Sequence, residues 1–485
     1  MMKRLQDIIY DVPYLELIGS EDVQISSICF DSRKVAKSSL YLAQKGTQVD
    51  GHIFIEKAIE SGASVVVCED LPTEIKDNIT YIKVADSSET LGLLASNYYD
   101  NPSEDLKLIG ITGTNGKTTS VSLLYNLFTN LGYRCGLIST VENRIADKVI
   151  PSTHTTPDSV ALNELLSQML AQGCDFCFME VSSHSVTQKR ISGLSFAAGV
   201  FTNLSHDHLD YHKTFDAYLK AKKEFFDNLP ANAFALSNLD DRNGQVMLQN
   251  TKATKHYYSA RSMADFRVKI IENAFSGLHL NIDGVEAYFN LVGEFNAYNI
   301  ISVYAVALLC KFDKMEVLTE LSNLKTAEGR FDYVENNSEI VAIVDYAHTP
   351  DALENVLETI EDIRQAGERI ITVVGCGGNR DAEKRPIMAR IAHDMSDVLI
   401  MTSDNPRHED PMEILEQMQA GIPADSQKQY LTIENRREAI KTATILAQKG
   451  DVILVAGKGH EKYQEIKGVR HHFDDKEELE KQLKK

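Results

Sequence analysis

Residues 110–120, GITGTNGKTTS, contain the residue types of a nucleotide phosphate-binding loop but depart from its usual pattern. That pattern, G-x-x-x-x-G-K-[ST], places a glycine five residues before Gly116, where this chain has isoleucine. The chemistry is still present, because Gly113 and Gly116 let backbone N–H groups converge on an anion at a helix N-terminus. Lys117 supplies a charge for the outer phosphates, and the Thr118 hydroxyl can bind Mg²⁺. Nucleotide binding is therefore favoured over an ordinary glycine-rich turn.

A second group of candidate residues lies in EVSSHSVTQKR (180–190) and FTNLSHDHLDYH (201–212). Glu180 and His208 each follow a predicted strand and could hold Mg²⁺, which takes mainly oxygen ligands but allows one imidazole. The second stretch is also similar to the H-x-H-x-D-H cluster of binuclear metal hydrolases, but its spacing differs by one residue. A serine nucleophile within 182–184 is disfavoured, because no G-x-S-x-G turn is present.

Composition limits the classes of function. A chain of 485 residues predicts roughly three domains, and its net charge of -20 argues against a nucleic-acid-binding surface. No apolar run approaches the roughly 20 residues of a membrane span, and the N-terminus turns acidic before a signal-peptide core develops. Seven scattered cysteines fit reduced thiols, and C-x-x-C at 174–177 favours buried strand cysteines over zinc or redox chemistry. We therefore expect a cytoplasmic protein without membrane insertion.

The order of apolar and polar segments predicts the organisation. Residues 1–98 contain short β-rich pieces between helical stretches, and the polar DNPSEDLK follows. Up to about residue 331, apolar strands alternate with helices, which indicates βαβ units and a mostly parallel sheet. After AEGRFDYV a second such series runs to residue 485, and its strands end at charged or glycine-rich motifs, where open α/β sheets bind ligands.

Ten motifs occur in order along nearly the whole chain: GITGTNGKTT, TTP, EVSSH, TNLSHDHLDYH, GEFNAYN, EGRFDYV, VDYAHTPDAL, GCGGNRDAEKRP, SDNPR and AGKGHE. Together they resemble the Mur ligase family, whose own phosphate loop, G-x-T-G-T-N-G-K-T, accounts for the departure noted above. The resemblance implies an α/β protein of three domains. These are a small N-terminal α/β domain for a UDP-linked substrate (1–98), a central P-loop domain with a parallel sheet for ATP (99–331) and a C-terminal Rossmann-like domain for an amino acid (332–485).

Within the family, the chain is similar to ligases that add the third amino acid to UDP-N-acetylmuramoyl-L-alanyl-D-glutamate during peptidoglycan precursor synthesis. Such ligases transfer the γ-phosphoryl group of ATP to a substrate carboxylate, and an amine then attacks the acyl phosphate to form an amide. The resemblance implies ATP and Mg²⁺ as cofactors, small-molecule substrates as partners and no nucleic acid. We expect a monomer.

The family motifs also imply residue roles. Catalytic roles fall on Lys117, Lys222 and His208, and the implied metal ligands are Thr118, Glu180, His208 and Lys222 as a carbamate. A carbamate would convert a cation that repels Mg²⁺ into an oxygen ligand. The sequence alone makes Lys220 and Lys223 equally plausible, and only the motif register selects Lys222. The implied ATP-binding residues are Gly113, Thr114, Asn115, Gly116, Lys117, Thr118, Thr119, Asn296, Arg330, Asp345 and His348.

Two further sets concern the other substrates. The implied contacts to UDP-MurNAc-dipeptide are Ser32, Arg33, Thr155, Thr156, Ser182, Gln188 and Arg190. The implied contacts to diaminopimelate are Arg380, Asp404, Asn405, Pro406, Arg407, Gly457 and Glu461. In this group DNPR goes with meso-diaminopimelate, and lysine-adding members typically lack the arginine. Diaminopimelate has a carboxylate that lysine lacks, so a specific site needs a fixed cation. The alternative is the same ligase adding L-lysine.

Overall fold

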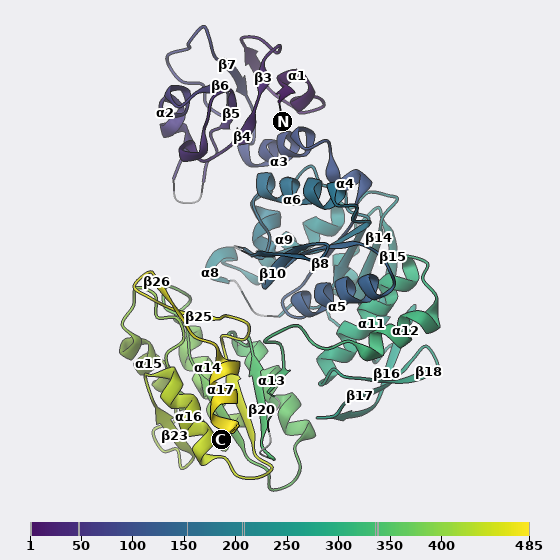
Figure 1. Ribbon diagram of the computed structural model, residues 1–485, viewed down its shortest axis with the longest axis vertical. Helices are drawn as coiled ribbons and strands as arrows, with labels where there is room; N and C mark the ends of the chain where they lie inside the picture. The colour runs from purple at the N-terminus through teal and green to yellow at the C-terminus, as the bar shows by residue number, and fades with distance from the viewer. Residues whose placement is uncertain are drawn as a thin grey trace.

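The computed structural model describes residues 2–46, 49–152, 154–205, 207, 209–334, 336 and 339–484. Figure 1 shows three α/β units that follow one another along the chain, with the N-terminal unit at the top and the C-terminal unit at the lower left. Each unit has its own sheet, of five, eleven and six strands. This is the three-domain α/β architecture expected from the sequence, whereas the boundaries after residues 98 and 331 stay predictions. Among the described residues no helix is long and apolar enough to cross a membrane.

The N-terminal unit is a small sheet with helices packed on it. Its strands β4 to β7 run parallel, and β2 is an antiparallel edge. The Asp86 carboxylate accepts hydrogen bonds from the first backbone N–H groups of α3, which fixes where that helix begins. The sheet order is β2 (Glu16–Ile18), β7 (Thr80–Lys83), β6 (Ala63–Cys68), β5 (Ser39–Leu42) and β4 (Ser27–Cys29), with helices α1 (Leu5–Ile8), α2 (Ile55–Glu60) and α3 (Ser87–Tyr98) and the short pair β1 (Lys3–Arg4) and β3 (Gln24–Ile25).

The central unit has a long sheet whose middle strands are parallel and covered on both faces. In β12, Phe176 and Phe178 pack in the cluster that contains α5 and α11, while Cys177 and Met179 pack in the cluster that contains α6 and α9. Alternate residues of a strand point to opposite faces, so a sheet covered on both sides requires continuous apolar strands. Both cysteines of C-x-x-C are buried free thiols, as expected, but only Cys177 lies in β12, whereas Cys174 precedes the strand.

The order of the central sheet places the phosphate-loop strand in its middle. Strand β8 lies between β12 and β13, and both pairings are parallel. The sheet order is β11 (Lys148–Pro151), β10 (Glu142–Ile145), β9 (Cys135–Ile138), β12 (Phe176–Glu180), β8 (Lys107–Thr112), β13 (Ala198–Phe201), β14 (Phe234–Asn238), β15 (Thr254–Ser259), β16 (Phe266–Ala274), β17 (Gly277–Ile282) and β18 (Val285–Phe289). The helices are α4 (Pro102–Asp105), α5 (Lys117–Asn130), α6 (Ser159–Ala171), α7 (Ser183–Thr187), α8 (Leu209–His212), α9 (Phe215–Asp227), α10 (Gly244–Met247), α11 (Glu294–Leu309) and α12 (Lys314–Asn323).

The C-terminal unit is a mostly parallel sheet with helices on both faces. Its sheet order is β19 (Asp332–Tyr333), β20 (Val341–Asp345), β24 (Val452–Ala456), β21 (Ile370–Val374), β22 (Val398–Met401) and β23 (Gln429–Thr432), with β19 antiparallel. The other elements are α13 (Pro350–Ile363), α14 (Lys384–Met395), α15 (Pro411–Gln419), α16 (Arg436–Leu446), α17 (Asp475–Leu483) and the hairpin β25 (Tyr463–Ile466) and β26 (Val469–His472). The loops that follow β20, β21, β22 and β24 lie together at the carboxyl ends of these parallel strands, where such folds bind ligands.

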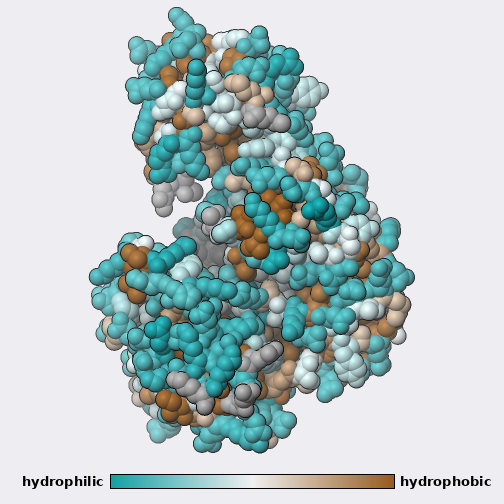
Figure 2. All heavy atoms as spheres, in the orientation of Figure 1, coloured by the Kyte–Doolittle hydropathy of each residue, from teal (hydrophilic) through white to brown (hydrophobic). Residues whose placement is uncertain are grey.

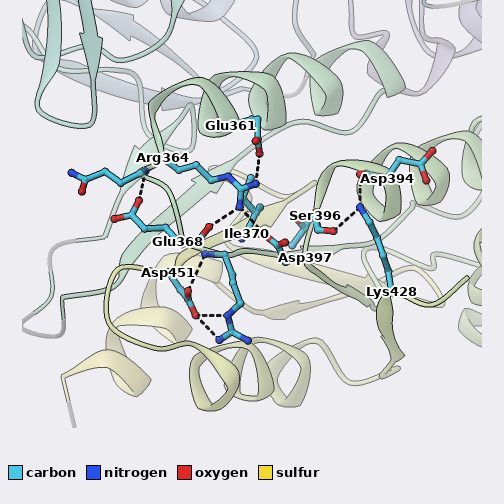
Figure 3. A network of polar contacts seen from close by, with 12 residues as sticks. Glu361, Arg364, Glu368, Ile370, Asp394, Ser396, Asp397, Lys428 and Asp451 are labelled. Atoms are coloured by element: carbon cyan, nitrogen blue, oxygen red, sulfur yellow. Dashed lines mark hydrogen bonds and ion pairs between the residues drawn. The ribbon is translucent and has the colours of Figure 1, made fainter.

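An ion-pair network lies at the opposite end of this sheet, where the parallel strands begin (Figure 3). The Arg364 guanidinium contacts the carboxylates of Glu361 at 2.7 Å and Asp397 at 2.8 Å. Asp397 also accepts from the Ile370 N–H at 2.8 Å, where β21 begins. These contacts hold the beginnings of β21 and β22 in place.

A buried ion pair ties the last helix to the C-terminal unit. Arg436 donates to both carboxylate oxygens of Asp475 at 2.7 Å, and both side chains are 0% exposed. Because Asp475→Ala would leave a buried guanidinium unpaired, we expect it to destabilise the C-terminal unit by about 3–5 kcal/mol in differential scanning calorimetry. The double variant Arg436→Met/Asp475→Leu should recover much of that loss, and a single variant within about 1 kcal/mol of the parent would contradict the expectation.

Candidate active site

A cavity of about 160 Å³ lies between the central and C-terminal units. Its central-unit wall consists of residues from the phosphate loop, the start of α5, the segments that follow the neighbouring strands, and α9: Thr114, Asn115, Gly116, Lys117, Thr118, Thr119, Thr140, Thr155, Glu180, Ser182, Ser183, Asp207 and Lys222. The other wall consists of Arg330, Tyr346, His348, Thr349 and Ala352. The structure therefore brings most of the predicted ATP and metal residues to one place.

The phosphate loop has the strand, loop and helix geometry expected from the sequence. It connects β8 to α5, and Gly113 and Gly116 have φ of 155° and 83°. A Cβ atom at Gly113 would lie 1.9 Å from the Thr202 hydroxyl, and one at Gly116 would lie 2.6 Å from the Asn299 side-chain oxygen. Glycine is therefore required at both positions, and the loop leads directly into the N-terminus of α5.

Two lysines meet at this loop. Lys117 donates to the Gly113 carbonyl at 2.9 Å, and Lys222 of α9 donates to the same oxygen at 2.7 Å. Lys222 is 1% exposed, and burial lowers the pKa of its amine well below the ordinary value. Tyr218 and Phe226, four residues before and after it, are also buried. This helical spacing is a signal that could have separated Lys222 from its neighbours in the sequence.

Candidate metal ligands lie beside these amines. The Glu180 carboxylate is fully buried at the end of β12 and accepts from the Thr118 hydroxyl at 2.9 Å and the Thr140 N–H at 2.8 Å. Arg330 donates to the Thr118 hydroxyl at 3.2 Å and lies over the ring of Tyr346, 4.7 Å from its centroid. His208, predicted as a metal ligand and catalytic residue, lies outside the described residues.

Four of the predicted muramoyl-dipeptide residues form one chain of contacts next to Glu180, and a fifth contacts Thr140, which is hydrogen-bonded to Glu180. The Thr156 hydroxyl donates to the Glu180 carbonyl at 2.7 Å and lies 3.5 Å from the Ser182 hydroxyl. Arg190 donates to the Thr156 carbonyl at 2.8 Å and to the Gln188 side chain at 2.6 Å. Thr155, the fifth, accepts from the Thr140 hydroxyl at 3.1 Å.

The remaining two residues of that set lie elsewhere. Ser32 and Arg33 belong to the N-terminal unit and do not line the cavity. The Arg33 side chain is exposed and pairs with Asp31 at 2.8 Å. In the space-filling view the molecule is hollowed between the N-terminal and C-terminal units (Figure 2).

The predicted ATP residues outside the phosphate loop are only partly brought together. His348 and Arg330 line the cavity, whereas Asp345 accepts from the backbone N–H groups of Phe331 at 2.6 Å and Ala347 at 2.7 Å. Burial raises the pKa of Asp345. These contacts make Asp345 a link between the segment that joins the two units and the start of the C-terminal wall.

Asn296 does not line the cavity. It is buried in α11, where its side chain donates to the Val292 carbonyl at 2.7 Å and accepts from Asn299 at 2.9 Å. Asn299 in turn contacts the Ser120 hydroxyl at 3.4 Å, next to the phosphate loop. A contact of Asn296 with adenine therefore stays a prediction.

The predicted diaminopimelate residues lie at the carboxyl ends of the strands of the C-terminal sheet. Asn405 donates to the Glu461 carboxylate at 2.7 Å, and Lys458 donates to the Asn405 side chain at 3.0 Å. Asp404 is buried, and Lys458 and other nearby cations keep its pKa lowered against the effect of burial. A Cβ atom at Gly457 would lie 3.0 Å from the Asp404 carboxylate, so this backbone closely approaches the charged group.

The two predicted arginines lie on neighbouring loops at the same end of the sheet. Arg407 follows Pro406 with a φ of 53° and donates to the Gly378 carbonyl at 2.8 Å. Arg380 is exposed on the loop that follows β21. The structure thus places one cation on each of two adjoining loops.

Lys458 and Asp351 are among the contributors that the sequence did not single out. Lys458, fully buried in AGKGHE, contacts both Asn405 and Glu461. Asp351, in the first turn of α13, accepts from the Asn115 side chain at 2.5 Å and from the Ser205 hydroxyl at 2.7 Å. Both lie inside motifs already singled out, AGKGHE and VDYAHTPDAL, so motif membership was the available signal.

The contacts of Asp351 join the two units across the cavity, which yields a prediction. We expect Asp351→Ala to weaken this junction, since hydrogen bonds to a charged group contribute about 1.5–3 kcal/mol each. The KM for ATP should rise about tenfold and small-angle scattering should report a more extended protein. Asp362→Ala, at the exposed far end of the same helix, is the control. Scattering profiles that match those of the parent would contradict a role in holding the units together.

Comparison with known proteins places this arrangement in a family. Three family models match, described as Mur ligase family, catalytic domain (residues 24–99), Mur ligase middle domain (111–307) and Mur ligase, glutamate ligase domain (329–459). A relative from Cytophaga hutchinsonii is 56% identical, over 98% of this chain and 97% of its own length. The chain belongs to the Mur ligase family. The resemblance drawn from the motifs is therefore confirmed.

Two relatives of this Mur ligase and one solved structure carry the same name. The Cytophaga hutchinsonii protein is named UDP-N-acetylmuramoyl-L-alanyl-D-glutamate--2,6-diaminopimelate ligase. A protein of the same name from Phocaeicola vulgatus is 55% identical, over 98% of each chain. A solved structure with that name in its description is 32% identical and has a TM-score of 0.70, over 99% of this chain and 98% of that chain. The match covers all three units of the Mur ligase fold.

Proposed function

We propose that this Mur ligase uses ATP to join meso-2,6-diaminopimelate to UDP-N-acetylmuramoyl-L-alanyl-D-glutamate, releasing ADP and phosphate. The observation that carries the proposal is that one cavity is lined both by the phosphate loop and by Thr155 and Ser182 of the muramoyl-dipeptide set. A carboxylate bound at those residues would lie beside the γ-phosphoryl group of ATP. The names of the relatives support the choice of substrates and of diaminopimelate over lysine.

The phosphate loop and its lysine perform the first half of the reaction in this proposal. Backbone N–H groups at the start of α5 and the Lys117 ammonium group neutralise the phosphates, which lets the substrate carboxylate approach the γ-phosphorus. The arrangement holds two anions together, so its contribution is positioning and electrostatic stabilisation. Arg330 adds a cation from the segment that joins the two units.

The oxygen atoms present fit a Mg²⁺ ion. The Thr118 hydroxyl and the Glu180 carboxylate lie 2.9 Å apart at the cavity wall, and hard cations prefer such ligands. When bound, Mg²⁺ would neutralise charge that develops on the phosphates. Lys222, held as a buried amine 2.7 Å from the loop carbonyl, would complete the ligand set as a carbamate.

The C-terminal loops perform the second half. Arg407 and Arg380 would pair the carboxylates of diaminopimelate, and Glu461 would receive an ammonium group. The other amine would then attack the acyl phosphate across the cavity, from which the two walls exclude water. The free cysteine thiols fit a reducing compartment such as the cytoplasm, and we expect the enzyme to act there as a monomer.

Phosphate release measured with each substrate omitted in turn tests the proposal. We expect turnover to require ATP, the muramoyl dipeptide and diaminopimelate together, with one amide formed per phosphate. ATP hydrolysis that ignores both the dipeptide and the amino acid would refute a ligase of this specificity and would favour a simple ATPase.

A further inference from the structure

The two loops that carry Arg380 and Arg407 are joined by an ion pair whose arginine is buried and whose carboxylate is 29% exposed. Arg385, in the first turn of α14, is 1% exposed and contacts the Glu409 carboxylate at 2.9 Å and 3.1 Å. The same guanidinium donates to the Gln417 side chain of α15 at 2.7 Å and to the Gly377 carbonyl at 3.3 Å. Arg385 thereby bridges a helix, the loop after β21 and the loop after β22.

Glu409 completes the bridge from its own side. Its carboxylate also accepts from the backbone N–H of Asn379, the residue before Arg380. Hydrogen bonding to Arg385 is the main reason why the pKa of Glu409 is lowered. Because Glu409 lies two residues after Arg407, this one carboxylate connects the backbone of both arginine-bearing loops to a fixed point on α14.

The two loops are in close contact and adopt demanding conformations. Asn379 and Arg407 both have φ of 53°, a region that residues other than glycine adopt at a cost. A Cβ atom at Gly378 would lie 2.0 Å from the Pro406 carbonyl, and one at Gly377 would lie 2.8 Å from the Arg407 guanidinium. Conformations of this kind persist only when several contacts hold them. The Arg385–Glu409 pair is such a contact.

We infer that Arg385 and Glu409 are positioning residues that set the selectivity for diaminopimelate over lysine. The inference rests on the proposed function, in which Arg380 and Arg407 bind the carboxylates of the amino acid. Lysine has no distal carboxylate, so its use depends less on the spacing of the two cations. Loss of the pair should therefore lower kcat/KM for diaminopimelate more than kcat/KM for lysine. The KM for ATP should stay unchanged.

The test compares Glu409→Gln with Arg364→Met, using complete enzyme and both amino acids. Glu409→Gln keeps the shape of the side chain and removes its charge. Arg364→Met removes the ion pairs with Glu361 and Asp397 in the same domain, at the opposite end of the sheet (Figure 3). For Glu409→Gln we expect the ratio of kcat/KM for diaminopimelate to that for lysine to fall at least about tenfold, mainly through KM for diaminopimelate. KM for ATP should stay within about twofold in both variants, and the ratio should not change in Arg364→Met.

Two further variants distinguish a positioning effect from a general loss of structure. Glu409→Asp retains the charge and should recover part of the ratio, whereas Arg385→Met should lower it as Glu409→Gln does. An unchanged ratio in Glu409→Gln, or a parallel rise in KM for ATP, would overturn the inference. A parent enzyme that does not use diaminopimelate would instead refute the proposed function, so the two failures are distinguishable.

Discussion

Replacement of Lys222 by alanine is expected to reduce kcat by about 10²–10³ or more, with partial recovery when a small carboxylate such as acetate or propionate is supplied. The reason is that Lys222 is buried beside the Gly113 carbonyl, where a protonated amine would repel Mg²⁺. Burial favours the neutral amine, which is the form that reacts with CO₂ to give a carbamate. An added carboxylate would replace the missing oxygen ligands. Phosphate release with all substrates present is the measurement.

The same helix offers matched controls for this variant. Lys220 is exposed and pairs with Asp216 at 2.7 Å, and Lys223 pairs with Asp227 at 2.6 Å. Lys220→Ala should retain parental activity, because an exposed ion pair of this kind contributes little. Full activity in Lys222→Ala, or recovery by chloride as well as by carboxylates, would show that no carbamate is needed there.

Replacement of Arg407 by alanine is expected to remove most of the preference for diaminopimelate. Sites built around a polar partner can reject an analogue that lacks it by about 10⁴-fold, so the parent should strongly prefer diaminopimelate to lysine. In Arg407→Ala, kcat/KM for diaminopimelate should fall by about 10²-fold or more, while that for lysine should change little. A competition assay with both amino acids in one reaction measures the ratio directly.

Arg437→Ala is the control for that experiment. Arg437 is a half-exposed cation of the same unit that pairs with Glu478 at 3.0 Å on the helical face. It should leave the ratio unchanged. An Arg407→Ala enzyme that keeps its selectivity would exclude Arg407 as the partner of the distal carboxylate, as would a parent enzyme that uses lysine equally well.

Local features of this protein could be predicted from its sequence, because they depend on neighbours along the chain. The strand, loop and helix around Gly113 and Gly116 follow from apolar periodicity and from the backbone freedom of glycine. The three-domain α/β order follows from the alternation of strand and helix patterns and is confirmed by the sheets. The inward position of Lys222 is also encoded in the sequence, by its helical spacing from the apolar Tyr218 and Phe226.

Contacts between distant segments could not be predicted in this way. Asp351 contacts Asn115, which lies 236 positions earlier in the sequence. Arg385 lies on α14 and contacts Glu409 in the loop after β22. Neither pair has a periodicity or spacing that would reveal it. The inward-facing pairing of Asn296 within α11, away from the cavity, likewise became evident only from the packing of that helix.

The sequence by itself determined which residues could do chemistry here: the phosphate loop, the carboxylate and lysine beside it, and the arginine of DNPR, because residue type and short spacing are properties of the chain. Only the tertiary structure decided that Thr118 and Glu180 lie 2.9 Å apart and that the two arginine-bearing loops rest on one ion pair. These distances depend on how sheets and helices pack over long range, where many side chains must fit together at once. Local patterns carry no information about that fit.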